Sequence, residues 1–239
     1  MPAGELVNEL TKALDRRDGY IMGATGQDPK SWGANSRWFT QYAGEQKKKA
    51  LYWRANAARV WDCNGLAEGI YKDFSGSDIN TKARYNYSGW CGVKGAGLIP
   101  KERRVPGAAV FFGDTASKIH HVAYLVEPVA AGKPEGDWYL IEARGVMYGV
   151  VKTRLNSRKP DFWGLMTKYF DYGSRFVQVT GGSVYVRDKP NKSGNIITVV
   201  KKGALLDYAG NTFENGWHGV KLDNKDGFIS GKYTCLTEA

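Results

Sequence analysis

The chain has 239 residues, of which 42% are hydrophobic and 13% aromatic, enough apolar side chains for one large core or two modest ones. It contains no run of about 20 apolar residues, which excludes a membrane-spanning helix. The three cysteines, Cys63, Cys91 and Cys235, are widely separated and lack C-x-x-C spacing. This spacing argues against a disulfide framework and against a zinc site. The sequence therefore predicts a folded, soluble protein with reduced thiols and no metal or other cofactor.

The net charge is +10, which predicts attraction to a polyanion such as nucleic acid, a membrane surface or an anionic cell-wall polymer. From Arg175 to the end, nine basic residues stand against six acidic ones, so +3 of the charge lies in this tail and +7 in the rest. The dense run Lys47-Lys48-Lys49 lies among aromatic residues that could stack on bases. A solvated helix face beside a substrate cleft is the preferred interpretation.

The N-terminal part begins with a predicted amphipathic helix over residues 5–16, because Leu6, Leu10, Ala13 and Leu14 share one face. Turn-forming residues then end the pattern. Residues 28–58 mix Pro, Gly, aromatic and basic residues with only patchy helical spacing, which indicates an insertion with short helices.

Cys63 lies where a turn opens into a predicted helix. Leu66, Ile70 and Phe74 recur every four positions after it, as the buried stripe of a short helix would. The thiol therefore falls at or near a helix N-terminus, where the partial positive charge favours thiolate over thiol. Cys91 and Cys235, which have no such context, are expected to be small buried hydrophobic residues.

A thiolate nucleophile also needs a group that accepts its proton and later protonates the leaving group. Only three histidines are available. His120 and His121 lie on a predicted strand over residues 119–126, whereas His218 lies near the end of the chain and is expected at the surface. A cysteine at a helix start and a histidine on a strand together indicate a thiol enzyme.

The order of elements predicts an α+β fold rather than alternating α/β, because one helix is followed by consecutive strands near residues 105–114, 119–126 and 138–143. Beyond these, short β-rich runs separated by Gly, Asn, Asp and Pro predict a small all-β barrel. The runs are residues 184–187, 196–200, 204–208, 217–222 and 227–229. We therefore expect a first domain over residues 1–173 and a second over residues 174–239.

Four motifs follow one another along the first domain: Gly19-Tyr20-Ile21-Met22-Gly23, Asp62-Cys63-Asn64-Gly65-Leu66, Val105-Pro106-Gly107 to Phe112, and His121-Val122-Ala123-Tyr124. Together they resemble the NlpC/P60 peptidases, which share a papain-like core and cut peptide bonds in peptidoglycan. With the segments 141–145 and 149–151, the resemblance is greatest to phage and prophage endolysins of Gram-positive hosts. The tail, with motifs at 184–190, 216–217 and 227–229, resembles bacterial SH3 (SH3b) wall-binding domains.

The resemblance implies that Cys63 is the nucleophile and His121 the general base. The family's third polar residue falls on Glu142, which would accept the far imidazole proton and orient the ring. The alternative for Glu142 is a solvated strand carboxylate, and His120 is expected to be a packing residue.

Four further residues are expected to contact substrate. Tyr20 matches the tyrosine that closes one side of the family's site, where its hydroxyl could hold substrate or the oxyanion. The others are Asp62, Asn64 and Arg144. Asn64 departs from the serine usual in the family, and the insertion at 28–58 alters the wall of the cleft.

The implied function is a peptidoglycan hydrolase that cuts the γ-D-glutamyl bond to the diamino acid of the stem peptide without a cofactor. N-acetylmuramoyl-L-alanine amidase activity on the same scaffold is an alternative. A non-catalytic wall-binding adaptor is a second alternative, against which the intact set of Cys63, His121 and Glu142 argues. A nucleic-acid-binding protein is a third, but no helix-turn-helix, RNA-binding aromatic motif or zinc spacing supports it.

The first ten residues alternate charged and apolar side chains where a secretory signal would be continuously apolar. We therefore expect synthesis in the cytoplasm without a signal peptide, and release to the wall through a holin-type pore. The expected partners are the peptidoglycan stem peptide and a wall polymer bound by the SH3b-like domain. Neither nucleic-acid binding nor membrane insertion is expected, and the protein is expected to be a monomer.

Overall fold

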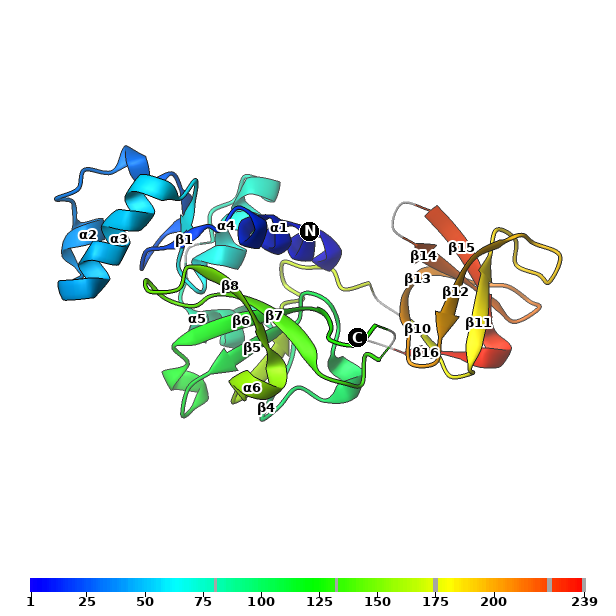
Figure 1. Ribbon diagram of the computed structural model, residues 1–239. Helices are drawn as coiled ribbons and strands as arrows, with labels where there is room; N and C mark the ends of the chain where they lie inside the picture. The colour runs from blue at the N-terminus through cyan, green and yellow to red at the C-terminus, as the bar shows by residue number, and fades with distance from the viewer. Residues whose placement is uncertain (80, 132, 174–175, 223–224, 238–239) are drawn as a thin grey trace. The chain divides into compact units, whose positions relative to one another are not determined.

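A computed structural model of the chain describes every residue except 80, 132, 174–175, 223–224 and 238–239. The chain divides into two compact units, and each takes in more than one stretch of sequence. The first is made of Met1–Pro100, Pro106–Glu127 and Trp138–Asp171, and the second of Lys101–Val105, Pro128–Asp137 and Tyr172–Ala239. Figure 1 shows helices and sheets together in the first unit and mainly strands in the second. The expected mixture of helix and sheet is confirmed.

A six-stranded sheet with the order β4-β9-β5-β6-β7-β8 forms the centre of the first unit. Strands β5, β6 and β7 are buried along most of their length, as their nearly continuous apolar runs require. Their pairing places His121, the first residue of β6, opposite Phe112 of β5. The strands are β4 (Val93–Ala96), β5 (Ala109–Phe112), β6 (His121–Pro128), β7 (Trp138–Ala143), β8 (Val150–Arg154) and β9 (Phe162–Leu165).

Helices α1 (Ala3–Asp15) and α4 (Gly65–Ser75) pack against each other, and α1 also contacts β7 and β8 (Figure 1). Helix α1 buries Leu6, Leu10 and Ala13, as its periodicity predicted. In α4 the expected stripe holds for Leu66 and Ile70, but Phe74 is 56% exposed because it lies in the last turn. Short helical segments complete this unit: α5 (Ala83–Tyr85), the π-helical turn η2 (Asn86–Trp90), η4 (Ala116–Lys118) and α6 (Leu155–Arg158).

The insertion at 28–58 forms η1 (Pro29–Ser31), α2 (Arg37–Thr40) and α3 (Gly44–Asn56) beside a small sheet. That sheet has the order β1-β3-β2, with β1 (Gly19–Tyr20), β2 (Thr25–Gln27) and β3 (Val60–Trp61). Three side chains fasten the insertion at two places, and one of them is Gln41, whose amide group donates to the Met22 carbonyl at 3.3 Å. The Tyr42 hydroxyl accepts a hydrogen bond from the Met22 amide at 2.7 Å, and the Trp53 indole donates to the Val146 carbonyl at 2.6 Å.

The second unit is built on a seven-stranded sheet with the order β12-β11-β15-β14-β13-β10-β16, and its described pairings are antiparallel. Valines and one isoleucine fill its core: Val177, Val179, Val184, Val186, Val220 and Ile229. The elements are η3 (Lys101–Arg103), β10 (Phe176–Val179), β11 (Ser183–Arg187), β12 (Ile196–Lys201), β13 (Leu205–Thr212), β14 (Trp217–Leu222), β15 (Lys225–Ser230), η5 (Gly231–Tyr233) and β16 (Thr234–Thr237).

Tyr185 of this unit is 49% exposed, because it alternates with the buried Val184 and Val186 along β11. Two other side chains differ from expectation. His218 is buried, and its Nδ1 lies 2.9 Å from the Thr212 hydroxyl. Cys235 is exposed.

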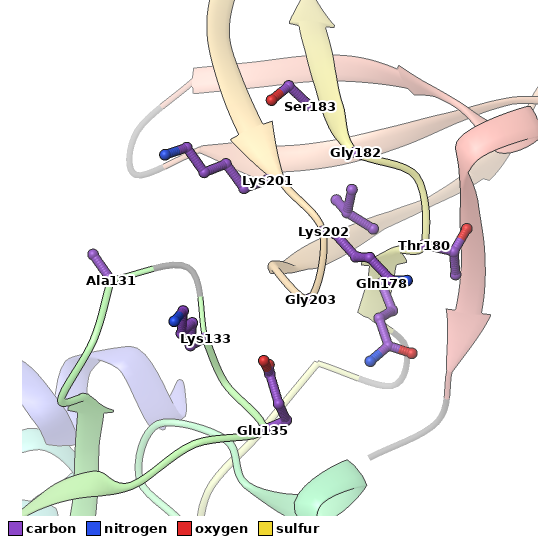
Figure 2. A pocket seen from close by; sticks show the side chains of 11 residues that line it. Ala131, Lys133, Glu135, Gln178, Thr180, Gly182, Ser183, Lys201, Lys202 and Gly203 are labelled. Carbon is purple, nitrogen blue, oxygen red and sulfur yellow. The ribbon is translucent and has the colours of Figure 1, made fainter.

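A hollow of about 740 Å³ opens in the second unit, and exposed lysines line much of it (Figure 2). Figure 2 shows Lys133 and Glu135 on one segment, and Lys201 and Lys202 at the end of β12. Three cations against one carboxylate make this surface locally positive.

Candidate active site

The turn that carries Cys63 joins β3 to α4, and Asp62 fixes its shape. One carboxylate oxygen of Asp62 accepts the Gly65 amide at 2.5 Å, and the other accepts the Gly23 amide at 2.9 Å. The first bond satisfies an amide at the start of α4, so Asp62 serves as its cap. The thiol thus lies just ahead of a helix start, as the sequence predicted.

Two glycines let α4 lie directly on the backbone of β2 and the residue before it. A Cβ added at Gly65 would collide with the Ala24 carbonyl oxygen, and one at Gly69 with the Thr25 carbonyl oxygen. Only glycine permits this close approach. The position of Cys63 is therefore set by strand β2 as well as by its own helix.

The Cys63 thiol is half-buried and donates a hydrogen bond to the His120 carbonyl oxygen over 3.8 Å. Burial, and then the charge of Asp62, raises the pKa of the thiol to about 12. Backbone amides of Val122, Asn64 and Cys63 itself act in the opposite direction but are outweighed. The expected effect of the helix start is therefore present but outweighed, and a base has to remove the thiol proton, as predicted.

The backbone on both sides of His121 contacts Cys63: the His120 carbonyl accepts the thiol hydrogen bond, and the Val122 amide interacts with Cys63. The ring packs near Phe112, with 5.3 Å between the ring centroids. Its Nε2 lies 2.6 Å from a carboxylate oxygen of Glu142. A carboxylate can only accept, so Nε2 carries a proton and Nδ1 of the neutral ring is left as the acceptor.

Glu142 is completely buried in β7, which contradicts the alternative of a solvated carboxylate. Burial alone would raise the pKa of this carboxyl group, but hydrogen bonds from His121, Arg158 and Thr153 lower it to about 2. Thr153 donates to Oε1 at 2.6 Å, and Arg158 donates to both oxygens, at 2.8 and 2.9 Å. The carboxyl group of Glu142 is therefore ionised at neutral pH.

Tyr20 and Arg144 are two of the four residues predicted to contact substrate. Burial, with the charges of Cys63 and Asp62, raises the pKa of Tyr20, so its hydroxyl stays protonated beside the thiol. Arg144 is exposed on the loop after β7, with its guanidinium 4.7 Å from the Tyr148 ring centroid. A substrate contact by either residue stays a prediction.

Asp62 and Asn64 are occupied within the protein. Both carboxylate oxygens of Asp62 bind backbone amides, as described above. Asn64 is 3% exposed, its side-chain oxygen accepts from Asn86 at 3.0 Å, and its amide group donates to Thr81 at 3.3 Å. Direct substrate contact by Asn64 does not fit this buried position, because its side chain holds the segment that follows α4.

The sequence did not single out Arg158 or Thr153. A buried carboxylate requires charged or hydrogen-bonding partners, and this was the only available signal. His120, expected to pack, is exposed, and its ring lies 3.4 Å from the Lys118 carbonyl. Cys91 is buried, as predicted.

Among the described residues, no group of three or more His, Cys, Asp and Glu side chains could hold a metal ion. Within the same residues, no helix is both long and apolar enough to cross a membrane.

No protein-family model matches this sequence, and no curated protein matches it. Solved structures are similar at low identity. The NlpC/p60 domain of the peptidoglycan hydrolase SagA is 19% identical, with a TM-score of 0.41, covering 70% of this chain and 100% of that one. Ly7917 is 13% identical, with a TM-score of 0.36, covering 100% of this chain and 99% of that one. Ly7917 with the hydrolyzing product of MDP gives the same identity and TM-score, and covers 100% of both chains. At these TM-scores the similarities bear on neither the fold nor the activity of this chain.

Proposed function

We propose that the chain is a cysteine peptidase that hydrolyses peptidoglycan, with Cys63 as nucleophile, His121 as general base and Glu142 as the group that orients His121. The observation that carries this proposal is the state of His121. One ring nitrogen is held at 2.6 Å by a buried, ionised carboxylate, and the two residues beside His121 in sequence touch the thiol. The other ring nitrogen is thereby left as an acceptor, and in the proposed reaction it takes the thiol proton.

In the proposed reaction, Nδ1 of His121 takes the thiol proton as Sγ of Cys63 attacks the amide carbonyl carbon. A C–S bond forms, and the carbonyl electrons move to the oxygen. When they return, the C–N bond breaks and His121 gives the proton to the leaving amine. Water then attacks the thioester with His121 again as base, which releases the acid and restores the thiol.

The tetrahedral oxygen needs hydrogen-bond donors during both steps. Tyr20 is a candidate, because its raised pKa keeps the hydroxyl protonated and able to donate. The amide of Cys63 is a second candidate, since it is part of the same turn. Glu142 would stabilise the imidazolium that forms when His121 holds the thiol proton.

The proposed substrate is the stem peptide of peptidoglycan, cut at the γ-D-glutamyl bond to the diamino acid. This choice rests on the four motifs that resemble NlpC/P60 peptidases. The muramoyl-L-alanine amide is the second candidate bond, because the same catalytic set would act on any amide placed against Cys63. An adaptor without catalysis is disfavoured, because a buried Glu142 charge against His121 is costly to maintain for binding alone.

We further propose that residues 174–239 form an SH3b-like wall-binding domain of a phage or prophage endolysin. The net charge of +10 suits the anionic polymers of a Gram-positive wall. Lys133, Lys201 and Lys202, which line the hollow of the second unit, are the cations best placed for such a polymer (Figure 2).

The test compares the parent protein with Cys63→Ala and the matched control Cys91→Ala on purified cell walls. Turbidity should fall with the parent and the control and stay constant with Cys63→Ala. Mass spectrometry of the fragments assigns the bond: an endopeptidase leaves L-alanyl-D-glutamate on the muramic acid, whereas an amidase frees the N-terminus of L-alanine. Lysis by Cys63→Ala at the parental rate would refute the nucleophile.

A further inference from the structure

Arg158, the last residue of α6, is the charged partner of Glu142. Its Nε lies 2.8 Å from Oε1 and its Nη2 lies 2.9 Å from Oε2, so the pair is bidentate. The Arg158 side chain is 23% exposed, and its guanidinium lies 4.6 Å from the centroid of the Phe112 ring. Phe112 in turn packs beside His121. Two side chains, Glu142 and Phe112, therefore contact both the Arg158 guanidinium and the His121 ring.

The charged and titratable groups around His121 come from four elements. Glu142 of β7 and Arg158 of α6 lie on its Nε2 side. Asp62 and Cys63, from the turn before α4, act from the other side, and the charge of His121 is one of the influences on Asp62. The charges of Cys63 and Asp62 also raise the pKa of Tyr20 in β1. Within the described residues, Arg158 is the cation bonded to this cluster.

Glu142 without Arg158 would be a buried, unpaired negative charge 2.6 Å from an imidazole. Such a charge favours the imidazolium strongly. An imidazolium cannot accept the proton of the Cys63 thiol, whose pKa is about 12. A cation on the same carboxylate reduces this tendency, and its two parallel hydrogen bonds also fix the plane of the carboxylate.

We propose that Arg158 is a positioning residue that neutralises Glu142, so that the carboxylate orients His121 without trapping a proton on it near neutral pH. This inference rests on the proposed function. It concerns the protonation of His121 beside Glu142 and Arg158, which can be measured without substrate.

The experiment follows the titration of the His121 ring by NMR in the full chain, where only three histidines have to be assigned. The variants are Arg158→Gln, which removes the charge, and Arg158→Lys, which keeps it but loses the fork. Thr153→Val is the matched control, because it removes a neutral donor from the same carboxylate. The pH dependence of kcat/KM on soluble muropeptide is measured in parallel.

Arg158→Gln should move the His121 titration midpoint, and with it the acid limb of the pH–rate profile, to higher pH by about one unit or more. Below the acid limb this shift means a rate about tenfold lower, carried by kcat rather than KM. Arg158→Lys should keep the midpoint and lower the rate, and Thr153→Val should shift the midpoint less than Arg158→Gln does.

An unchanged or lower midpoint in Arg158→Gln would overturn the proposal. So would a midpoint in Arg158→Lys that is about one unit or more above that of the parent. This second criterion applies even where the glutamine variant does not fold. If the parent cuts no peptidoglycan but the midpoints move as expected, the proposed function fails while the role of Arg158 stands.

Discussion

Replacing Glu68 with glutamine should stabilise the first unit at pH 8 and leave its stability unchanged at pH 4. Glu68 is 3% exposed on α4, where its Oε1 accepts hydrogen bonds from the amide and the hydroxyl of Thr81. Burial raises its pKa from 4.5 to about 7, although the bonds from Thr81 oppose this. Glutamine keeps an oxygen acceptor for Thr81 and has no proton to release.

The magnitude follows from proton linkage. The unfolded chain releases the Glu68 proton near pH 4.5 and the folded chain only near pH 7. Between these values the free energy of unfolding falls as the pH rises, by about 1.4 kcal/mol per unit, or about 3 kcal/mol in total. The raised pKa thus favours the folded state only at acid pH, and Glu68→Gln should recover about 3 kcal/mol above pH 7.

Urea denaturation at pH 4, 6 and 8, followed by tryptophan fluorescence, measures the difference. Glu45→Gln is the matched control, since the Glu45 side chain is 75% exposed on α3 and its loss should change stability by less than about 0.5 kcal/mol. A stabilisation of equal size at pH 4 and pH 8 would refute the linkage argument. So would the absence of stabilisation at pH 8.

Three further predictions concern the site and the second unit. Asp62→Asn should lower the pKa of the Cys63 thiol, because the Asp62 charge is the second cause of its rise. Alkylation by iodoacetamide should then reach its half-maximal rate at lower pH than in the parent. An unchanged pH profile would leave burial as the cause of the raised pKa. Glu142→Gln should retain a reduced but measurable lytic rate and Glu142→Ala less, since only the amide can still accept the imidazole proton, and parental rates for both would make Glu142 dispensable. A chain ending at Tyr172 should still cut soluble muropeptide but sediment less with intact walls, because a tethered binding module raises the local concentration of enzyme; unchanged sedimentation would remove the targeting role from the tail.

The local sequence pattern was sufficient to predict features that depend on a single helix or strand. The 3.6-residue period of Leu6, Leu10 and Ala13 predicted the buried face of α1, and apolar runs predicted β5, β6 and β7. Strands β10 and β16 were not predicted. They pair with each other from opposite ends of the segment 176–237, and a pairing between residues so far apart in sequence leaves no local pattern.

The electrostatics of the site depended on contacts that no local pattern contains. The helix start acts on Cys63 as expected, but burial and Asp62 act more strongly, and both follow from the tertiary packing. In the same way, Glu142 required a cation, and the nearby Lys152, Arg154 and Arg158 were equally eligible by sequence. Only the return of the chain through α6 selects Arg158.

The two anchors of the 28–58 insertion have a consequence for engineering this scaffold. Tyr42 fastens the insertion to the turn beside Cys63 through Met22, and Trp53 fastens it to the loop after Glu142 through Val146. A segment attached at both places acts as a spacer between them. Exchanged whole, such a segment would bring its own spacing between the Met22 turn and the Val146 loop. A chimera whose junction lies within the insertion would combine two halves from different proteins, and their lengths need not match.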